Sequence, residues 1–201
     1  MKSKIPKFWH FGFTLIELLV VFSLAVIFAV VTIPSYINFN REQEVKQSAL
    51  FLKSQIRKAQ NSSLSGEKST TSCTQSDVLT GFFVELAVNQ KSFVYGGRCG
   101  DIDFNKTTLK LPSSNTKISG FYDATSLPTP PCSAFTPGNG SLRLNYRPVA
   151  KGIDFYDWNS AIASGSNLNY GKIAIKISDA NANDYFIIIS SGGEIYDTAS
   201  C

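Results

Sequence analysis

The sequence predicts an α+β protein in which one long N-terminal helix precedes a β-rich region. Residues 13–64 keep apolar side chains at helical spacing, whereas residues 67–201 hold short alternating apolar runs separated by turn residues. The composition agrees, because 43% of the 201 residues are hydrophobic and only 17% are charged. That is enough apolar surface for a folded core and too little charge for a disordered chain.

The N-terminal part of the helix predicts a membrane anchor. Residues 1–12 contain three lysines and His10 but no acid, and Leu18 to Ile33 carry no charge. With residues 13–16 the apolar run covers about 21 positions interrupted only by Glu17, and a membrane-spanning helix needs about 20. We therefore expect a single-pass inner-membrane helix over 13–36, with its N-terminus in the cytoplasm. An ordinary secretory signal fits poorly, because the run is long and no Ala-x-Ala follows it.

The junction around Gly12 resembles a known processing site. Gly12 is followed by Phe13-Thr14-Leu15-Ile16-Glu17, which looks like the cleavage site of type IV pilins and type II secretion pseudopilins. The resemblance implies that prepilin peptidase cuts after Gly12 and so removes the leader 1–12. It also implies that the Phe13 amine is then N-methylated. It also implies assembly through Phe13 and Glu17, the carboxylate pairing with the Phe13 amine of a neighbouring subunit. A carboxylate in an apolar span needs such a partner, unless it reaches the membrane interface.

The second half of the helix predicts a surface for a β-domain. Pro34 is expected to kink the helix, because it removes one backbone donor. Beyond it an apolar stripe recurs at helical spacing, and Ser65-Gly66 supplies a C-terminal stop. This defines a helical domain over 13–66. The stripe consists of Val45, Ala49, Leu52, Ile56, Ala59 and Leu64.

The segment that closes this helix narrows the resemblance. Residues 52–65 are similar to the corresponding segment of GspH/FimT-type minor pseudopilins, although Ile56 replaces a leucine and Gln60 stands where arginine is common. The implied function is a structural subunit of a type IV pilus or type II secretion pseudopilus. Its implied partners are other pilin subunits, prepilin peptidase and the inner-membrane assembly platform. A major pilin, or another class of minor pilin, is the alternative.

Residues 67–201 predict a periplasmic or extracellular domain built on an antiparallel sheet. Residues 141–147 alternate strictly, so we expect a half-buried strand with Arg143 and Arg147 on its solvated face. Residues 126–139 hold four prolines and one glycine and predict a loop. Further strands are expected over 81–88, 91–95, 108–111, 117–121, 172–178, 185–190 and 194–196.

All four cysteines lie in the predicted exported domain. An even number there indicates disulfides, and four cysteines allow three pairings. We favour Cys73–Cys99 and Cys132–Cys201, which join neighbours in the chain. No Cys-x-x-Cys motif supports zinc binding.

The residue types argue against an enzyme. Once the leader is removed the chain has no histidine, which excludes Ser-His-Asp and Cys-His machinery. The acidic pairs Asp101 with Asp103 and Asp154 with Asp157 lack the apolar surroundings that a general acid needs. We expect solvated acids there and no catalysis.

Two weaker hypotheses concern ligands. Asp179, Asn181 and Asn183 match the first oxygen ligands of a calcium loop, but the later positions depart from it, and an Asn/Asp-rich hairpin turn explains them without a metal or other cofactor. A DNA-binding minor pilin for DNA uptake is the alternative function. Its best candidate contacts are Arg143, Arg147 and Lys151, yet residues 67–201 hold 11 basic and 12 acidic residues, which disfavours DNA binding.

Overall fold

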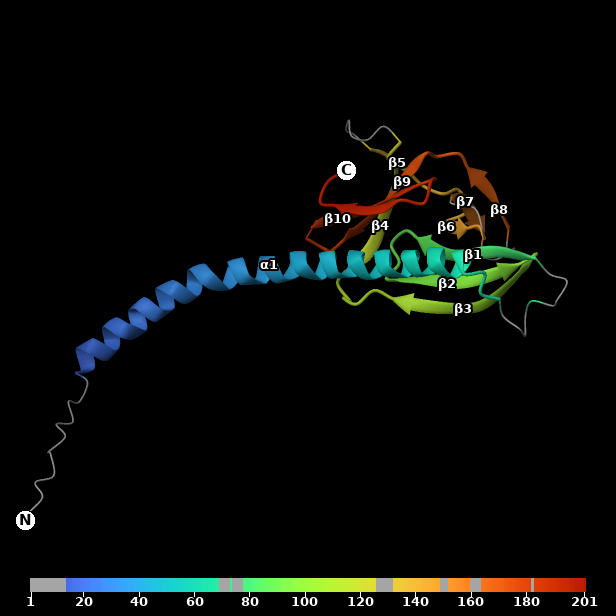
Figure 1. Cartoon of the computed structure of the whole chain (residues 1–201). Coiled ribbons are helices and arrows are strands. Elements are labelled where there is room, and N and C mark those ends of the chain that lie inside the picture. The colour runs from blue at the N-terminus through green and yellow to red at the C-terminus, as the bar shows by residue number, and fades with distance from the viewer. Residues whose placement is uncertain are drawn as a thin grey trace, which may run out of the picture. The chain divides into compact units, whose positions relative to one another are not determined.

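The computed structural model describes residues 14–68, 73, 78–125, 132–148, 152–159, 164–181 and 183–201. These form one helix followed by strands in two antiparallel sheets, so the predicted α+β class is confirmed (Figure 1). Helix α1 spans Leu15–Leu64. The strands are β1 Leu79–Ala87, β2 Ser92–Cys99, β3 Ile102–Lys110, β4 Lys117–Asp123, β5 Ser133–Phe135, β6 Ser141–Tyr146, β7 Ile153–Asn159, β8 Ser164–Leu168, β9 Lys172–Ser178, β10 Asp184–Ser190 and β11 Ile195–Thr198.

Local signals at both ends of α1 explain its bounds. Thr14 caps the start, because its hydroxyl oxygen accepts the Glu17 amide at 3.3 Å. At the other end Gly66 has φ +65°, and the Gly66 and Glu67 amides donate back to the carbonyls of Ser63 and Ser62. This is the left-handed glycine stop that the sequence predicts. The backbone is helical through position 34, and the kink at Pro34 stays a prediction.

The chain divides into two units, residues up to Asn40 and residues from Arg41 onward. In the first unit the described side chains of α1 are exposed almost throughout. Within the described residues, no helix combines the length and the apolar character needed to cross a membrane. The predicted single-pass inner-membrane anchor over 13–36 is therefore wrong.

In the second unit α1 packs on both sheets and closes one hydrophobic core. Val45, Ala49, Leu52, Ile56 and Ala59 are at most 2% exposed, as the stripe predicts. Leu64 departs from this prediction, because it is the last residue of α1 and stays more than half exposed.

Sheet A has the order β3-β2-β1-β6-β7-β8, with every neighbouring pair antiparallel. Its inner face adds to the core shared with α1, and strands β1, β2 and β3 run alongside the second half of the helix (Figure 1). Ring contacts and hydrogen bonds fix this arrangement, since Phe51 meets Phe93 and the Tyr95 hydroxyl donates to Ser62. The edge strand β8 and its neighbour β7 were not expected from the sequence.

Sheet B has the order β11-β10-β9-β4-β5. Successive side chains of β9 and β10 point to opposite faces of the sheet. Ile173, Ile175 and Ile187 belong to the main core, while Ala174 and Ile188 belong to a smaller cluster. The short strand β5 lies inside the stretch 126–139 that was expected to be a loop, and it pairs with β4.

Both favoured disulfides are confirmed. Cys73 is bonded to Cys99 and Cys132 to Cys201, with Cα atoms 5.7 Å apart in each pair. The first bond ties the segment after α1 to the end of β2. The second holds Cys201 beside the outer cluster of sheet B. Such bonds are typical of proteins in an oxidising compartment.

Candidate functional site

The residues expected to direct assembly lie at the start of α1. Gly12 and Phe13 are outside the described residues. Glu17 occupies the third position of the helix after the Thr14 cap, which is the Thr-x-x-Glu arrangement of a capping box. A carboxylate in the first turn also complements the helix dipole. Glu17 therefore has a local role in starting the helix, in addition to any role between subunits.

The first half of α1 is an apolar surface with no cover from the described part of the chain. Leu15 is 84% exposed and Phe22 64%, and residues on every side of the helix share this exposure. The apolar set includes Ile16, Leu18, Leu19, Val20, Val21, Leu24, Val26, Ile27, Val30, Ile33, Tyr36, Ile37 and Phe39. A helix that is apolar all round is normally buried on all sides, so this segment calls for a partner.

Polar contacts fix the second half of α1 to the strand β11. Lys53 pairs with Asp197, the Arg57 guanidinium donates to the Ile195 carbonyl at 3.3 Å, and the Gln60 amide donates to the Gly193 carbonyl at 3.0 Å. Hydrogen bonds from Lys53 and from the Tyr185 hydroxyl hold the pKa of Asp197 below its usual value. The same bond to Asp197 raises the pKa of Tyr185 to about 12. The helix face is thus rigidly attached to the domain.

The outer face of sheet A contains a buried ionic and aromatic cluster centred on Arg143. Its guanidinium lies between the rings of Phe83 and Trp158, with its carbon 3.7 and 3.4 Å from their centroids. It donates to Glu85 at 3.0 Å and to the two oxygens of Asp103 at 3.2 and 3.0 Å. Arg143 is only 2% exposed. The prediction of a solvated Arg143 is therefore wrong.

The topology explains this burial. β6 lies in the middle of sheet A between β1 and β7, and register places Glu85 and Tyr156 directly opposite Arg143. Long side chains on the strands of sheet A therefore contribute to covering one another. Arg98 extends the cluster, since it pairs with Asp103 at 3.4 Å and lies over the Trp158 ring.

Of the remaining candidate nucleic-acid contacts, the structure describes only Arg147. Arg147 is exposed but is held in an ion pair with Asp154. Lys151 is outside the described residues. The acids named as candidate pairs also have structural partners, because Asp157 accepts the Gly138 and Asn139 amides at 2.9 Å each.

The candidate calcium residues form a turn that satisfies its own carboxylate. Asp179 accepts the backbone amides of Asn181 and Asn183 at 2.8 and 3.0 Å, and the Asn183 side-chain amide at 2.9 Å. Burial raises the pKa of Asp179, but these hydrogen bonds outweigh it and leave the pKa below its usual value. Among the described residues, no cluster of three metal-ligating side chains is present.

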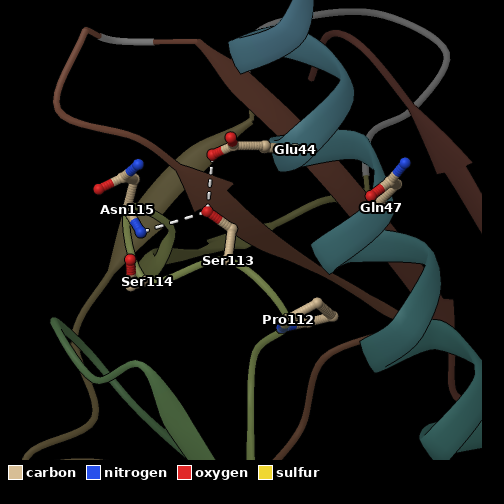
Figure 2. A pocket seen from close by; sticks show the side chains of 6 residues that line it. All are labelled: Glu44, Gln47, Pro112, Ser113, Ser114 and Asn115. Carbon is tan, nitrogen blue, oxygen red and sulfur yellow. Dashed lines mark hydrogen bonds between the residues drawn. The ribbon is translucent and has the colours of Figure 1, made fainter.

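Three cavities surround the loop 112–115, which follows β3. One, of about 300 Å³, lies between this loop and α1, and Figure 2 shows Ser113 directed at Glu44 across it. The Ser113 hydroxyl donates to the Glu44 carboxylate at 2.7 Å and accepts a hydrogen bond from the backbone amide of Asn115. A second cavity, of about 370 Å³, includes Arg41 and Lys91. The third, of about 570 Å³, lies at the open end of the β2–β3 hairpin.

Comparison with known proteins gives no family. No family model, curated protein or solved structure matches the chain.

Proposed function

We propose that this chain is a structural minor subunit of a type IV pilus or type II secretion pseudopilus, processed after Gly12 and assembled through the first half of α1. One observation carries the proposal, namely the exposure of apolar side chains on every side of α1 between Leu15 and Phe39. Copies that pack these helices together remove that surface from water, at about 1.5–3 kcal/mol for each large side chain fully buried.

The resemblance of residues 12–19 supports this reading, since it adds a leader, a cleavage site and a charge inside the same helix. Glu17 becomes desolvated when such helices pack, so its carboxylate needs a cationic partner. The Phe13 amine of a neighbouring copy is the group that the resemblance supplies. The second half of α1, bound to both sheets, leaves the β-domain on the outside of the assembly.

The direct test is to place charges in the exposed half of α1. Val20→Glu combined with Ile27→Glu is expected to abolish filament assembly, because the new carboxylates would be buried without partners. Tyr196→Glu is the matched control, since Tyr196 is also an exposed apolar residue, but on β11. Assembly is measured by sedimentation and electron microscopy of the full chain. Filaments from the double variant at the level of the control would contradict the proposal.

Glu17 has two roles that substitution can separate. Glu17→Gln keeps the capping geometry but removes the charge, whereas Glu17→Ala removes both. If the charge pairs with a neighbouring amine, both variants are expected to lose assembly while α1 stays helical by circular dichroism. Intact mass serves as the control, because both chains should begin at N-methylated Phe13. Normal assembly of Glu17→Gln would show that only the cap matters.

A further inference from the structure

The β2–β3 hairpin has opposite charges at its two ends. Ser92 pairs with Lys110 at one end, and Cys99 pairs with Ile102 at the other. Lys91 and Lys110 therefore lie together at the open end, while Asp101 lies in the turn. The eight residues of β2 separate these ends by about 26 Å, at ~3.3 Å per residue.

The open end is an apolar cavity with two cations whose charge is not neutralised. The cavity has a volume of about 570 Å³, and its lining includes Lys91, Lys110, Leu111 and Pro112. Among the described residues Lys110 has no ion pair, and Lys91 donates only to the Ser114 carbonyl, at 2.6 Å. The adjoining cavity adds Arg41, which likewise has no ion pair within the described part of the chain. The acid in the lining of this adjoining cavity, Asp179, already accepts hydrogen bonds from the amides of Asn181 and Asn183.

The turn end presents the complementary chemistry. The Asp101 side chain is fully exposed, with a relative exposure of 104%, and it forms a solvent-exposed ion pair with Arg98 at 3.6 Å, which contributes little and can be exchanged for another cation. Val78 and Ile102 flank it and are 76% and 58% exposed, which is unusual in this otherwise well-covered domain. An exposed acid and two exposed apolar residues therefore lie at the same end of the hairpin.

Several bonds hold the turn end in one conformation. The Gly100 amide donates to the Val78 carbonyl at 3.0 Å, and the Thr80 hydroxyl donates to the Gly100 carbonyl at 3.1 Å. The Arg98 guanidinium donates to the carbonyls of Gly100 and Asp101. The disulfide at Cys99 adds a covalent tie. A surface ordered in advance loses little conformational entropy when it binds.

We propose that the turn end of one copy inserts into the open end of the next copy, with Asp101 between Lys91 and Lys110 and with Val78 and Ile102 against Leu111 and Pro112. The inference rests on the proposed function, which brings copies of this chain together through the first half of α1. The hairpin runs along the same direction, since its residues Phe93 and Tyr95 meet Phe51 and Ser62 in turn. For two copies whose hairpins point in the same direction, the proposed contact requires a displacement of about one hairpin length along the hairpin.

Cross-linking tests the contact directly. The full chain carrying Asp101→Cys and Lys110→Cys is expected to give a ladder of covalent oligomers on mild oxidation, because all four native cysteines are already bonded to one another. Chains with either substitution alone should give no ladder. The matched control replaces Glu194 instead of Asp101, since Glu194 is an exposed acid away from the turn. Absence of a ladder from the Asp101 pair, or an equally strong ladder from the control, would overturn the proposal.

Charge exchange provides the second measurement. Asp101→Lys is expected to reduce assembly by about tenfold or more, because like charges facing each other disfavour association. Lys91→Glu with Lys110→Glu should do the same, and the chain carrying all three changes should regain assembly. Lys46→Glu with Lys172→Glu alters the net charge equally at residues that do not line the cavity. If only the lysine changes reduce assembly, the cavity holds another partner's group and the proposal fails.

The two proposals fail in different ways. A Val26→Cys chain reports helix packing, because Val26 lies in the exposed half of α1. A helix cross-link without a hairpin ladder would overturn the hairpin contact and leave the filament function intact. A hairpin ladder without a helix cross-link would support the contact and reject assembly through α1.

Discussion

Arg143→Ala is expected to lower the free energy of unfolding by about 3–5 kcal/mol, the largest loss from any single substitution considered for this chain. The change removes the cation that Glu85 and Asp103 share at a buried site, and Glu85 loses its ion pair with Arg143 while Asp103 keeps Arg98. It also opens a gap between Phe83 and Trp158, which the guanidinium fills. Urea unfolding of the full chain, followed by circular dichroism, measures the loss.

Arg147→Ala is the matched control, because Arg147 follows β6 directly and also forms an ion pair, with Asp154. The Arg147 side chain is 56% exposed, so its pair is expected to contribute at most about 1 kcal/mol. Similar losses from the two alanine variants would contradict the assignment of a buried ionic cluster.

A third variant separates charge from packing. Arg143→Met with Glu85→Gln removes the two charges of the buried pair and leaves Asp103 paired with Arg98, while a long side chain still lies between the rings. Since unpaired charge dominates the cost of breaking a buried pair, this variant is expected to recover most of the stability. If it stays as unstable as Arg143→Ala, the loss comes from packing between the rings instead.

Removing the disulfide between Cys132 and Cys201 is expected to have the second largest effect. The bond closes 69 residues, for which the chain-entropy relation gives about 4.4 kcal/mol, against about 3.5 kcal/mol for the 26 residues between Cys73 and Cys99. We therefore expect Cys132→Ala with Cys201→Ala to be more destabilising than Cys73→Ala with Cys99→Ala. Urea midpoints of the two double variants, measured under identical conditions, test the order.

The surroundings of the two bonds provide the control. Cys99 is 2% exposed in the main core, so its replacement also removes packing, whereas Cys201 is only partly buried against the outer cluster of sheet B. Reduced wild-type protein separates these contributions, because reduction breaks the bonds and keeps the sulfur atoms. If the Cys73–Cys99 variant is the less stable even after this correction, loop length does not determine the order.

Features that depend on local periodicity could be predicted from the sequence. The helix, its glycine stop and five of the six stripe positions follow from apolar spacing, since a 3.6-residue repeat identifies the face that packs. The cysteine pairing followed from proximity in the chain. Strands such as β9 and β10 could also be predicted, because their isoleucines form clear apolar runs.

Features that depend on how strands are ordered could not be predicted. Alternation assigns Arg143 to one face of β6, but it does not reveal that β1 and β7 cover that face with Glu85 and Trp158. The strand β7 mixes acids with aromatic residues, and β8 is almost entirely polar, so neither gives a strong apolar signal. The neighbours of each strand set the burial of its polar residues, and a single sequence does not contain that order.

The attachment of α1 to β11 also has a consequence for the time at which the domain is completed during synthesis. The bonds from Lys53, Arg57 and Gln60 reach residues 133–144 positions later in the chain. At translation rates of about 5–20 residues per second, the helix emerges on the order of 10 s before the strand that covers part of it. During that interval the apolar stripe is exposed on a nascent chain, so folding of this domain begins with its most aggregation-prone surface and ends with β11.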